Sequence, residues 1–322
     1  MDPQTLASRP PASGARGTGG GVLMSVTSMA LVQLALALSV HLFDQLGPLG
    51  VAGLRLAWAG VLLLALVRPR LRHFTRRDLL ACTMLGAVTA GLMLLFMLAI
   101  ARIPLGTASA LEFLGPLTVS LASRGGGHRR WALPAAGGVV LLTQPWHGIA
   151  DPAGIAFALA AGVCWGAYIL LTQHVGDHVT GLSGLAVSMP VAGVVALAAA
   201  APSLGRLTWQ LLGIMLVLAA LHPVVTFILE FRALRRLTVR AFGTLMSLEP
   251  GIALLAGLLV LGQVPDAASA VGIILVVIAG TGAARTGGRV PGPEVNRDEE
   301  PALSRSATGR PGRVAAESGS TV

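Results

Sequence analysis

The chain has 322 residues, of which 54% are hydrophobic and only 11% are charged, and its formal net charge is +9. Soluble domains carry about 25% charged residues, so the composition excludes a soluble protein and predicts an all-α polytopic membrane protein. All basic residues are arginines, and they lie between apolar runs and in the tails, which argues against a nucleic-acid partner. Cys82 and Cys164 lie within apolar runs and are interpreted as packing residues, not as a disulfide or metal site.

Residues 1–21 are rich in Gly, Pro and Ser, and we predict a disordered cytoplasmic leader there. Ten apolar segments follow, each predicted to cross the bilayer as a helix. They lie near residues 22–43, 47–67, 79–101, 106–123, 131–147, 153–173, 181–201, 208–231, 238–262 and 266–284. The polar residues 285–322 cannot bury enough apolar surface to fold alone and are predicted to form a disordered cytoplasmic tail.

Arginine counts predict the orientation, because loops rich in arginine stay in the cytoplasm. The loops after the second, fourth and eighth segments are the basic ones, with Arg68, Arg70, Arg72, Arg76, Arg77, Arg124, Arg129, Arg130, Arg232, Arg235, Arg236 and Arg240. The opposite loops carry only Arg102 and Arg206. We therefore predict a multi-pass protein of the cytoplasmic (inner) membrane with both termini in the cytoplasm.

Two stretches of the sequence correspond to each other. Residues 102–116 and 236–250 both begin with Arg, enter an apolar helix and end in Pro, at an offset of 134 (residue 250 less residue 116). This match predicts two five-helix repeats, 22–147 and 153–284. Because five is an odd number of crossings, the second repeat must be inserted upside down. Interrupted helices in corresponding halves of a chain indicate the binding site of a transporter.

Glu249 and Pro250 lie about halfway along the ninth segment. A charge at that depth costs roughly 2.5–3.5 kcal/mol on insertion scales, and Pro250 leaves the carbonyl of Met246 without its helical donor. A hydrated cavity or a neighbouring helix can satisfy these groups, whereas lipid cannot. We interpret Glu249 as lining a substrate or proton path; the alternative is a buried, protonated Glu that bonds to another helix.

Glu112 and Arg55 reach a similar predicted depth, so the sequence favours an ion pair between them, as a structural clamp or as a gate. Pro116 frees the carbonyl of Glu112 in the same way as its counterpart in the second repeat.

His222, Thr226 and Glu230 recur at steps of four and predict a polar stripe on one helical face. The stripe could relay protons; alternatively, Glu230 forms an interfacial ion pair with Arg232 or Arg236. Trp165 and Tyr168 could stack on a ligand or fill space between helices. Gly86, Gly91, Gly162 and Gly166 are expected to let helices approach closely.

The sequence also resembles a known family in several phrases. They are Gly47-Pro-Leu-Gly-Val51, Leu54-Arg-Leu56, Ile103-Pro-Leu-Gly106, Ala110-Leu-Glu-Phe113, Gly115-Pro-Leu117, Ala161-Gly-Val-Cys-Trp165, Tyr168-Ile-Leu170 and Phe242-Gly-Thr-Leu-Met-Ser-Leu-Glu-Pro250. Over residues 25–284 the chain resembles the EamA type of the drug/metabolite transporter superfamily, and within it the bacterial threonine/homoserine exporters.

The resemblance implies a secondary transporter that exports amino acids or related small metabolites, usually with the proton as coupling ion. One departure is Leu261-Gly-Gln263, where the family commonly has Leu-Gly-Glu, which weakens a proton role at that position. On this reading, a zwitterionic substrate lies between the repeats near Glu112 and Glu249, with its carboxylate near Arg55 or the end of a broken helix.

The expected partners are a small-molecule substrate, the proton and membrane lipid, with no cofactor and no metal. A drug, nucleotide-type or lipid-linked cargo is the alternative within transport, and a non-transporting sensor or a membrane enzyme is the alternative outside it. The sequence contains no P-loop, no His-Glu-x-x-His motif and no Gly-x-Ser-x-Gly motif, so we expect no enzyme and assign no catalytic residue.

Overall fold

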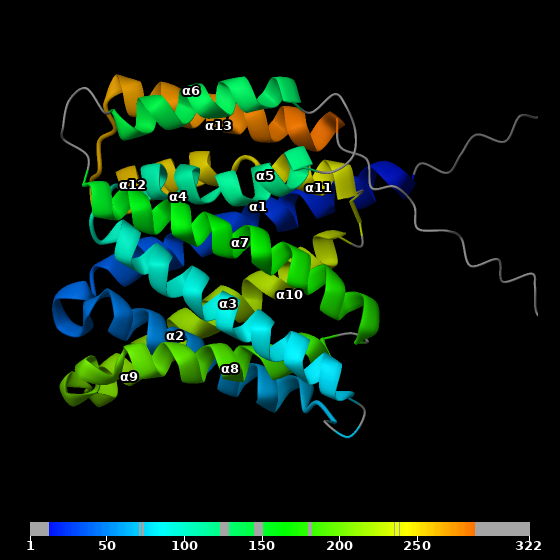
Figure 1. The fold of residues 1–322 in the computed structure, drawn as a ribbon, viewed down its shortest axis with the longest axis vertical. Helices are drawn as coiled ribbons and strands as arrows, with labels where there is room; N and C mark the ends of the chain where they lie inside the picture. The colour runs from blue at the N-terminus through cyan, green and yellow to red at the C-terminus, as the bar shows by residue number, and fades with distance from the viewer. Residues whose placement is uncertain are drawn as a thin grey trace, which may run out of the picture. The chain divides into compact units, whose positions relative to one another are not determined.

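A computed structural model of the chain shows only helices, turns and irregular segments among the residues that it describes (Figure 1). These residues are 13–70, 72, 74–122, 129–144, 151–179, 182–234, 236–237 and 239–286. Within them, and counting a broken helix as one span, eight helices are long and apolar enough to cross a membrane. The chain is thus a helical, multi-pass membrane protein.

The elements follow one another with short connections. They are α1 (Ser13–Val40), α2 (Phe43–Val67), α3 (Arg76–Ile100), α4 (Leu105–Glu112), α5 (Leu114–Ala122), η2 (Arg129–Trp131), α6 (Ala132–Thr143), α7 (Pro152–His178), α8 (Ser183–Ala199), η3 (Ala201–Arg206), α9 (Trp209–Ala219), η4 (Ala220–Val225), α10 (Thr226–Leu234), α11 (Val239–Met246), α12 (Glu249–Leu261) and α13 (Ala267–Thr286).

The boundaries differ from the predicted ones in two respects. Helix α1 begins at Ser13, so it includes part of the stretch expected to be a disordered leader; residues 1–12 and the predicted tail beyond Thr286 lie outside the described residues. The fifth and seventh predicted segments correspond to α6 and α8, which have only 12 and 17 residues. A straight span needs about 20 residues, so length alone supports crossing for eight of the ten predicted segments.

Helix ends follow local sequence signals. Thr75 caps α3 in a capping box, because its hydroxyl accepts from the Asp78 N–H while the Asp78 carboxylate accepts from the Thr75 N–H. Asp151 caps α7, with Pro152 in its first turn, where a missing N–H costs nothing. Gly262 ends α12 with a left-handed φ of 66°, which glycine adopts without a Cβ clash.

Three of the long segments are broken in the middle. Helix α4 ends at Glu112 and α5 begins at Leu114, with Pro116 in the first turn of α5. Helix α11 ends at Met246 and α12 begins at Glu249, directly before Pro250. The break between α9 and α10 was not predicted: His222 leaves the helical region, with φ −137° and ψ 117°, within the π-type segment η4. Pro223 was the sequence signal for it.

The helices pair across the two halves of the sequence. Helix α2 packs along α8, α3 along α7, α1 along α10, α4 along α12, and α6 along α13. Figure 1 shows α6 and α13 side by side at one edge of the bundle and α8 and α9 near the opposite edge. The largest buried apolar cluster joins α3, α4, α5 and α7 to α12 and α13. The cluster includes Leu111, Phe113 and Leu117, so the break between α4 and α5 is buried.

Candidate functional site

A cavity of about 230 Å³ lies among the broken helices. Its walls come from both halves of the sequence, and Leu56, Thr89 and Trp165 place it near the middle of α2, α3 and α7. Its polar lining residues are Thr89, Glu112, Tyr168, His222, Thr226, Glu230 and Glu249. We call it the central cavity. Seven of the ten site residues predicted from the sequence line it: Glu112, Glu249, Met246, Trp165, Tyr168, Glu230 and His222.

The two helix breaks place Glu112 and Glu249 in the central cavity. Glu112 is the last residue of α4, and Glu249 is the first residue of α12. Pro116 and Pro250 do not line the cavity themselves; they lie just beyond the two acids and remove the N–H groups that would bond the carbonyls of Glu112 and Met246. Each proline therefore accompanies a break that carries one carboxyl group into the bundle.

Among the residues that the structure describes, no cationic side chain forms an ion pair with the carboxyl groups of the central cavity. Glu249 is only 8% exposed; its Oε1 accepts from Gln33 Nε2 at 3.3 Å, while its Oε2 is buried without a hydrogen-bond partner. Among the described residues, the only ion pair of the structure joins Arg102 and Asp151. A buried charge without a partner is costly, so the cavity can accept a cationic group or a proton. Gln33, in the apolar helix α1, was not among the predicted site residues.

The predicted ion pair between Arg55 and Glu112 is wrong. Arg55 is 1% exposed; its Nη1 donates to Ser39 Oγ at 3.0 Å and its Nη2 lies 2.7 Å from His222 Nδ1. The prediction compared depth along each helix and ignored direction. Helix α2 packs mainly on α8, α9, α3 and the 3-10 and π segments η3 and η4, so the side chain of Arg55 meets α1 and η4 and not α4.

The polar stripe of His222, Thr226 and Glu230 faces the central cavity, although the break at His222 interrupts its helical spacing. Glu230 accepts a hydrogen bond from Ser28 Oγ at 3.0 Å. It forms no ion pair with Arg232 or Arg236, so the interfacial pair offered as an alternative is wrong within the described residues. Three carboxyl groups therefore line the cavity wall.

The aromatic residues Trp165 and Tyr168 line the central cavity, and Trp165 also packs against another helix segment. The Trp165 ring meets the Phe113 ring edge to face, with centroids 6.2 Å apart and an interplanar angle of 72°. Phe113 is the residue between α4 and α5, so Trp165 supports the break that positions Glu112. Trp165 and Tyr168 both remain on the cavity wall, where stacking on a ligand stays a prediction.

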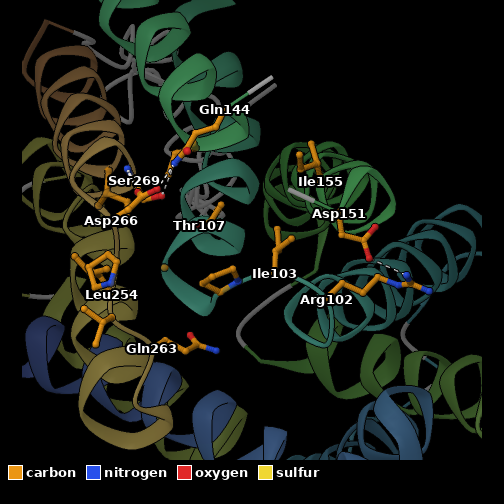
Figure 2. Close-up of a pocket in the computed structure, with 16 residues that line it drawn as sticks. Arg102, Ile103, Thr107, Gln144, Asp151, Ile155, Leu254, Gln263, Asp266 and Ser269 are labelled. Atoms are coloured by element: carbon orange, nitrogen blue, oxygen red, sulfur yellow. Dashed lines mark hydrogen bonds and ion pairs between the residues drawn. The ribbon is translucent and has the colours of Figure 1, made fainter. Parts of the chain in front are cut away.

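A second pocket, of about 270 Å³, lies where the turn from α3 to α4, the end of α6, the start of α7 and the turn from α12 to α13 meet (Figure 2). We call it the end pocket. Gln144 Nε2 donates to Asp266 at 2.5 Å, and Arg102 pairs with Asp151 at 2.9 Å. Both contacts join residues before position 147 to residues after position 150, so they tie the halves together at this end.

Gln263 forms a third link at the end pocket, since its Oε1 accepts from the Leu105 N–H at 2.9 Å. Residue 105 opens α4, and the preceding residue, Pro104, has no side-chain cap to offer. An amide oxygen satisfies this N–H as a carboxylate would. Gln263 therefore supplies a capping contact to α4 without placing a charge at this end.

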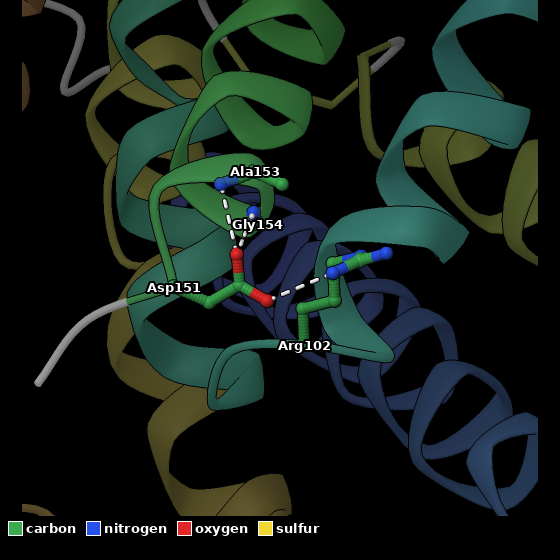
Figure 3. Close-up of polar contacts among 4 residues, drawn as sticks. All are labelled: Arg102, Asp151, Ala153 and Gly154. Atoms are coloured by element: carbon green, nitrogen blue, oxygen red, sulfur yellow. Dashed lines mark hydrogen bonds and ion pairs between the residues drawn. The ribbon is translucent and has the colours of Figure 1, made fainter.

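Figure 3 shows how Asp151 serves two purposes. One carboxylate oxygen accepts from the N–H groups of Ala153 and Gly154 at the start of α7, and the other accepts from Arg102. The Arg102 hydrogen bond and these backbone donors lower the pKa of Asp151. A folded-state pKa below the unfolded value means that the ionised form stabilises the folded protein, and that this contribution is lost as pH falls through the folded pKa.

We therefore expect wild-type protein to lose its stability advantage over Asp151→Asn as pH falls below about 4, the ordinary pKa of an aspartate. Asn keeps the capping oxygen but not the charge. Thermal unfolding of both proteins in detergent, at pH 6 and below pH 4, measures this difference. The effect is small because the pair is exposed. An advantage that is equal at both pH values contradicts the assignment.

The fold and the site together define a multi-pass helical membrane protein with a cavity that both halves of its sequence line and that holds three carboxyl groups. Residues 152–282 match the EamA-like transporter family. The chain is 34% identical over 276 residues to the threonine/homoserine exporter RhtA of Salmonella typhimurium (strain LT2), a match that covers 84% of this chain and 93% of the relative. It is 35% identical over 248 residues to RhtA of Escherichia coli (strain K12), covering 75% and 83%.

A solved crystal structure also has the same fold, with a TM-score of 0.55 at 20% identity over 83% of this chain and 97% of the other. The chain therefore belongs to the EamA-like transporters of the drug/metabolite type. It is a membrane transporter for a small molecule.

Proposed function

We propose that the protein is a secondary exporter of small amino acids, with threonine and homoserine as the substrates to test first. The observation that carries the proposal is the position of Glu112 and Glu249, which bring two carboxyl groups from the two halves into one cavity, where neither forms an ion pair with a described residue. An amino acid brings an ammonium group that pairs with a carboxylate. The names of the RhtA relatives support the same substrate class.

The size and charge of the central cavity favour this cargo over the larger alternatives. Pockets for drug-sized ligands occupy about 300–1,000 Å³, whereas this cavity has about 230 Å³. A nucleotide-type cargo carries phosphate groups, and the carboxyl groups of the wall would repel them.

We further propose ten crossings arranged as two inverted repeats. Helices α4 and α11 have eight residues each and begin 134 positions apart (residue 239 less residue 105). In the proposed repeats, α1 corresponds to α7, and α3 corresponds to α9–α10. If the halves are related by a two-fold axis, the contact between α3 and α7 must have a counterpart between α10 and α1. Both contacts are present. The presence of both equivalent contacts supports a two-fold relation between the halves. The short helices α6 and α8 would then cross the membrane packed along α13 and α2, respectively.

Alternating access follows from this arrangement. The halves would rock about the central cavity, and the end pocket would open when the contacts from Arg102 to Asp151 and from Gln144 to Asp266 break. By the arginine distribution, this end faces away from the cytoplasm, both termini lie in the cytoplasm, and the membrane is the inner membrane. The carboxyl groups of the cavity can each carry a proton, so we propose the proton as coupling ion.

The test is efflux of radiolabelled threonine or homoserine from proteoliposomes that contain the purified protein. We expect efflux above that of protein-free liposomes, saturation with substrate, and acceleration when the outside is acidic. A sensor would bind the amino acid without moving it, and an enzyme would convert it, so recovered radiolabel is also analysed for chemical identity. Binding without efflux, or a converted product, contradicts the proposed transport.

A further inference from the structure

Arg55 is a fully buried cation next to the central cavity without an anionic partner. No carboxylate pairs with it among the described residues, and its Nε is buried without a hydrogen-bond partner. Ser39, which accepts from Nη1, itself donates to the Ala35 carbonyl at 2.6 Å, so its hydroxyl is fixed. Removing such a charge from water is costly unless an anion compensates it. Among the described residues no anion lies against Arg55, and a ligand could supply one.

Arg55 does not line the cavity; His222 stands between them. The His222 ring lines the cavity and has its Nδ1 at 2.7 Å from Arg55 Nη2. A guanidinium nitrogen can only donate, so Nδ1 must accept, and the neutral ring then carries its proton on Nε2. The positive charge of Arg55 also polarises the imidazole, which strengthens Nε2–H as a donor.

We propose that His222, held and polarised by Arg55, is the subsite that recognises the carboxylate of the substrate. This inference rests on the proposed function and divides the cavity into two ends. The ammonium group pairs with Glu112 or Glu249, and the substrate carboxylate accepts from Nε2–H of His222. Arg55 is a positioning residue that acts through the ring. The helix is broken at His222, and the His222 ring there contacts Arg55 of α2 and also lines the central cavity.

The chemistry of this subsite selects for a free carboxylate. A threonine methyl ester keeps the ammonium group and nearly the same shape but has no negative charge. Hydrogen bonds to charged groups are the stronger ones, so losing this charge should weaken binding by about 10- to 100-fold. A 2-hydroxy acid analogue keeps the carboxylate and loses the ammonium group, so it tests the opposite end of the cavity.

The experiment measures how well threonine, its methyl ester and the 2-hydroxy analogue compete with radiolabelled threonine in proteoliposomes. Wild-type protein is expected to prefer threonine over the ester by about 10- to 100-fold. His222→Leu should lose that preference by binding threonine more weakly, and it should keep the preference for threonine over the 2-hydroxy analogue. His222→Gln offers both an acceptor and a donor and should retain much of the preference for the free carboxylate.

Two results overturn the subsite. One is a wild-type protein that binds threonine and its ester equally well; this result needs no variant to fold. The other is a His222→Leu protein that keeps the full preference. A wild-type protein that neither binds nor moves threonine or homoserine would instead overturn the proposed function, and the subsite with it. A monodisperse elution profile and an unchanged melting temperature confirm that each variant is folded.

Discussion

Glu249→Gln is expected to lower threonine efflux by at least about 30-fold, because truncating one partner of a buried charge pair costs about 2–5 kcal/mol. The amide keeps the size of the side chain, and its oxygen can still accept from Gln33 Nε2. It cannot pair with an ammonium group or carry a proton. Because Glu249 is buried and has no cationic partner among the described residues, the neutral amide should leave the folded state at least as stable as wild type. Efflux from proteoliposomes and thermal unfolding measure the two effects separately.

The matched control is Asp44→Asn, the same carboxyl-to-amide change on an exposed residue near the start of α2, outside the central cavity. It should leave efflux unchanged. Efflux by Glu249→Gln at the wild-type rate would favour the alternative in which Glu249 is a buried structural carboxyl group. A Glu249→Gln protein that fails to fold would favour that alternative as well.

Glu112→Gln separates the roles of the two acids. Glu112 makes no ion pair with a described residue, so it is free for the substrate or for a proton. If one carboxylate holds the ammonium group and the other carries the coupling proton, one variant weakens substrate binding and the other abolishes acceleration by outside acid. Measuring both properties for both variants assigns the roles.

The two cavity acids could be predicted from the sequence because a charged residue in the middle of an apolar segment is energetically unfavourable in lipid. Glu112 and Glu249 stand in apolar runs beside Pro116 and Pro250, and a charge beside a missing N–H has few places to lie in a membrane. The offset of 134 between the two stretches also separates the ends of α4 and α11, at Glu112 and Met246, although the sequence analysis did not place these ends. The energetic cost of a charge in lipid and the match between the two stretches can both be read from the sequence, and they were enough to predict the two acids.

The partners of Arg55 could not be read in the same way. Depth along a helix follows from counting residues, but the direction of a side chain depends on which helices are neighbours. Arg55 bonds to Ser39 and His222, 16 and 167 residues away in the chain. Ser28 and Gln33 were missed for a related reason, since a single small polar residue in an apolar helix gives no signal until its partner is known.

The glycines show how far sequence reasoning about packing reaches. A Cβ on Gly86 would lie 2.4 Å from the Ser188 carbonyl oxygen, and one on Gly162 would lie 2.7 Å from the Glu112 carbonyl oxygen, so both do permit close approach. Gly91 and Gly166 have their nearest neighbours at 3.4 and 3.3 Å and are less confined. The tightest contact, at Gly115, was not among the four that the sequence indicated.

Gly115→Ala is therefore expected to be among the most damaging single changes in the protein. The added Cβ would lie 1.8 Å from the Gly162 carbonyl oxygen, and backbone cannot move aside as a flexible side chain can. Overpacking costs typically about 1–3 kcal/mol and occasionally more; we expect about 3 kcal/mol or more here, seen as a large drop in melting temperature. Separating α5 from α7 would also displace Glu112, three positions earlier, so the folded fraction should transport poorly.

Gly91→Ala is the matched control, because it makes the same change in the middle of a helix that packs along α7. Its Cβ would lie 3.4 Å from Cys164 Sγ, an ordinary contact. Alanine favours a helix over glycine by up to about 1 kcal/mol, so this variant should be as stable as wild type or slightly more stable. Equal melting temperatures for Gly115→Ala and Gly91→Ala would mean that α5 and α7 are not in backbone contact. The break after Glu112 would then be held by Pro116 and the Phe113–Trp165 contact alone.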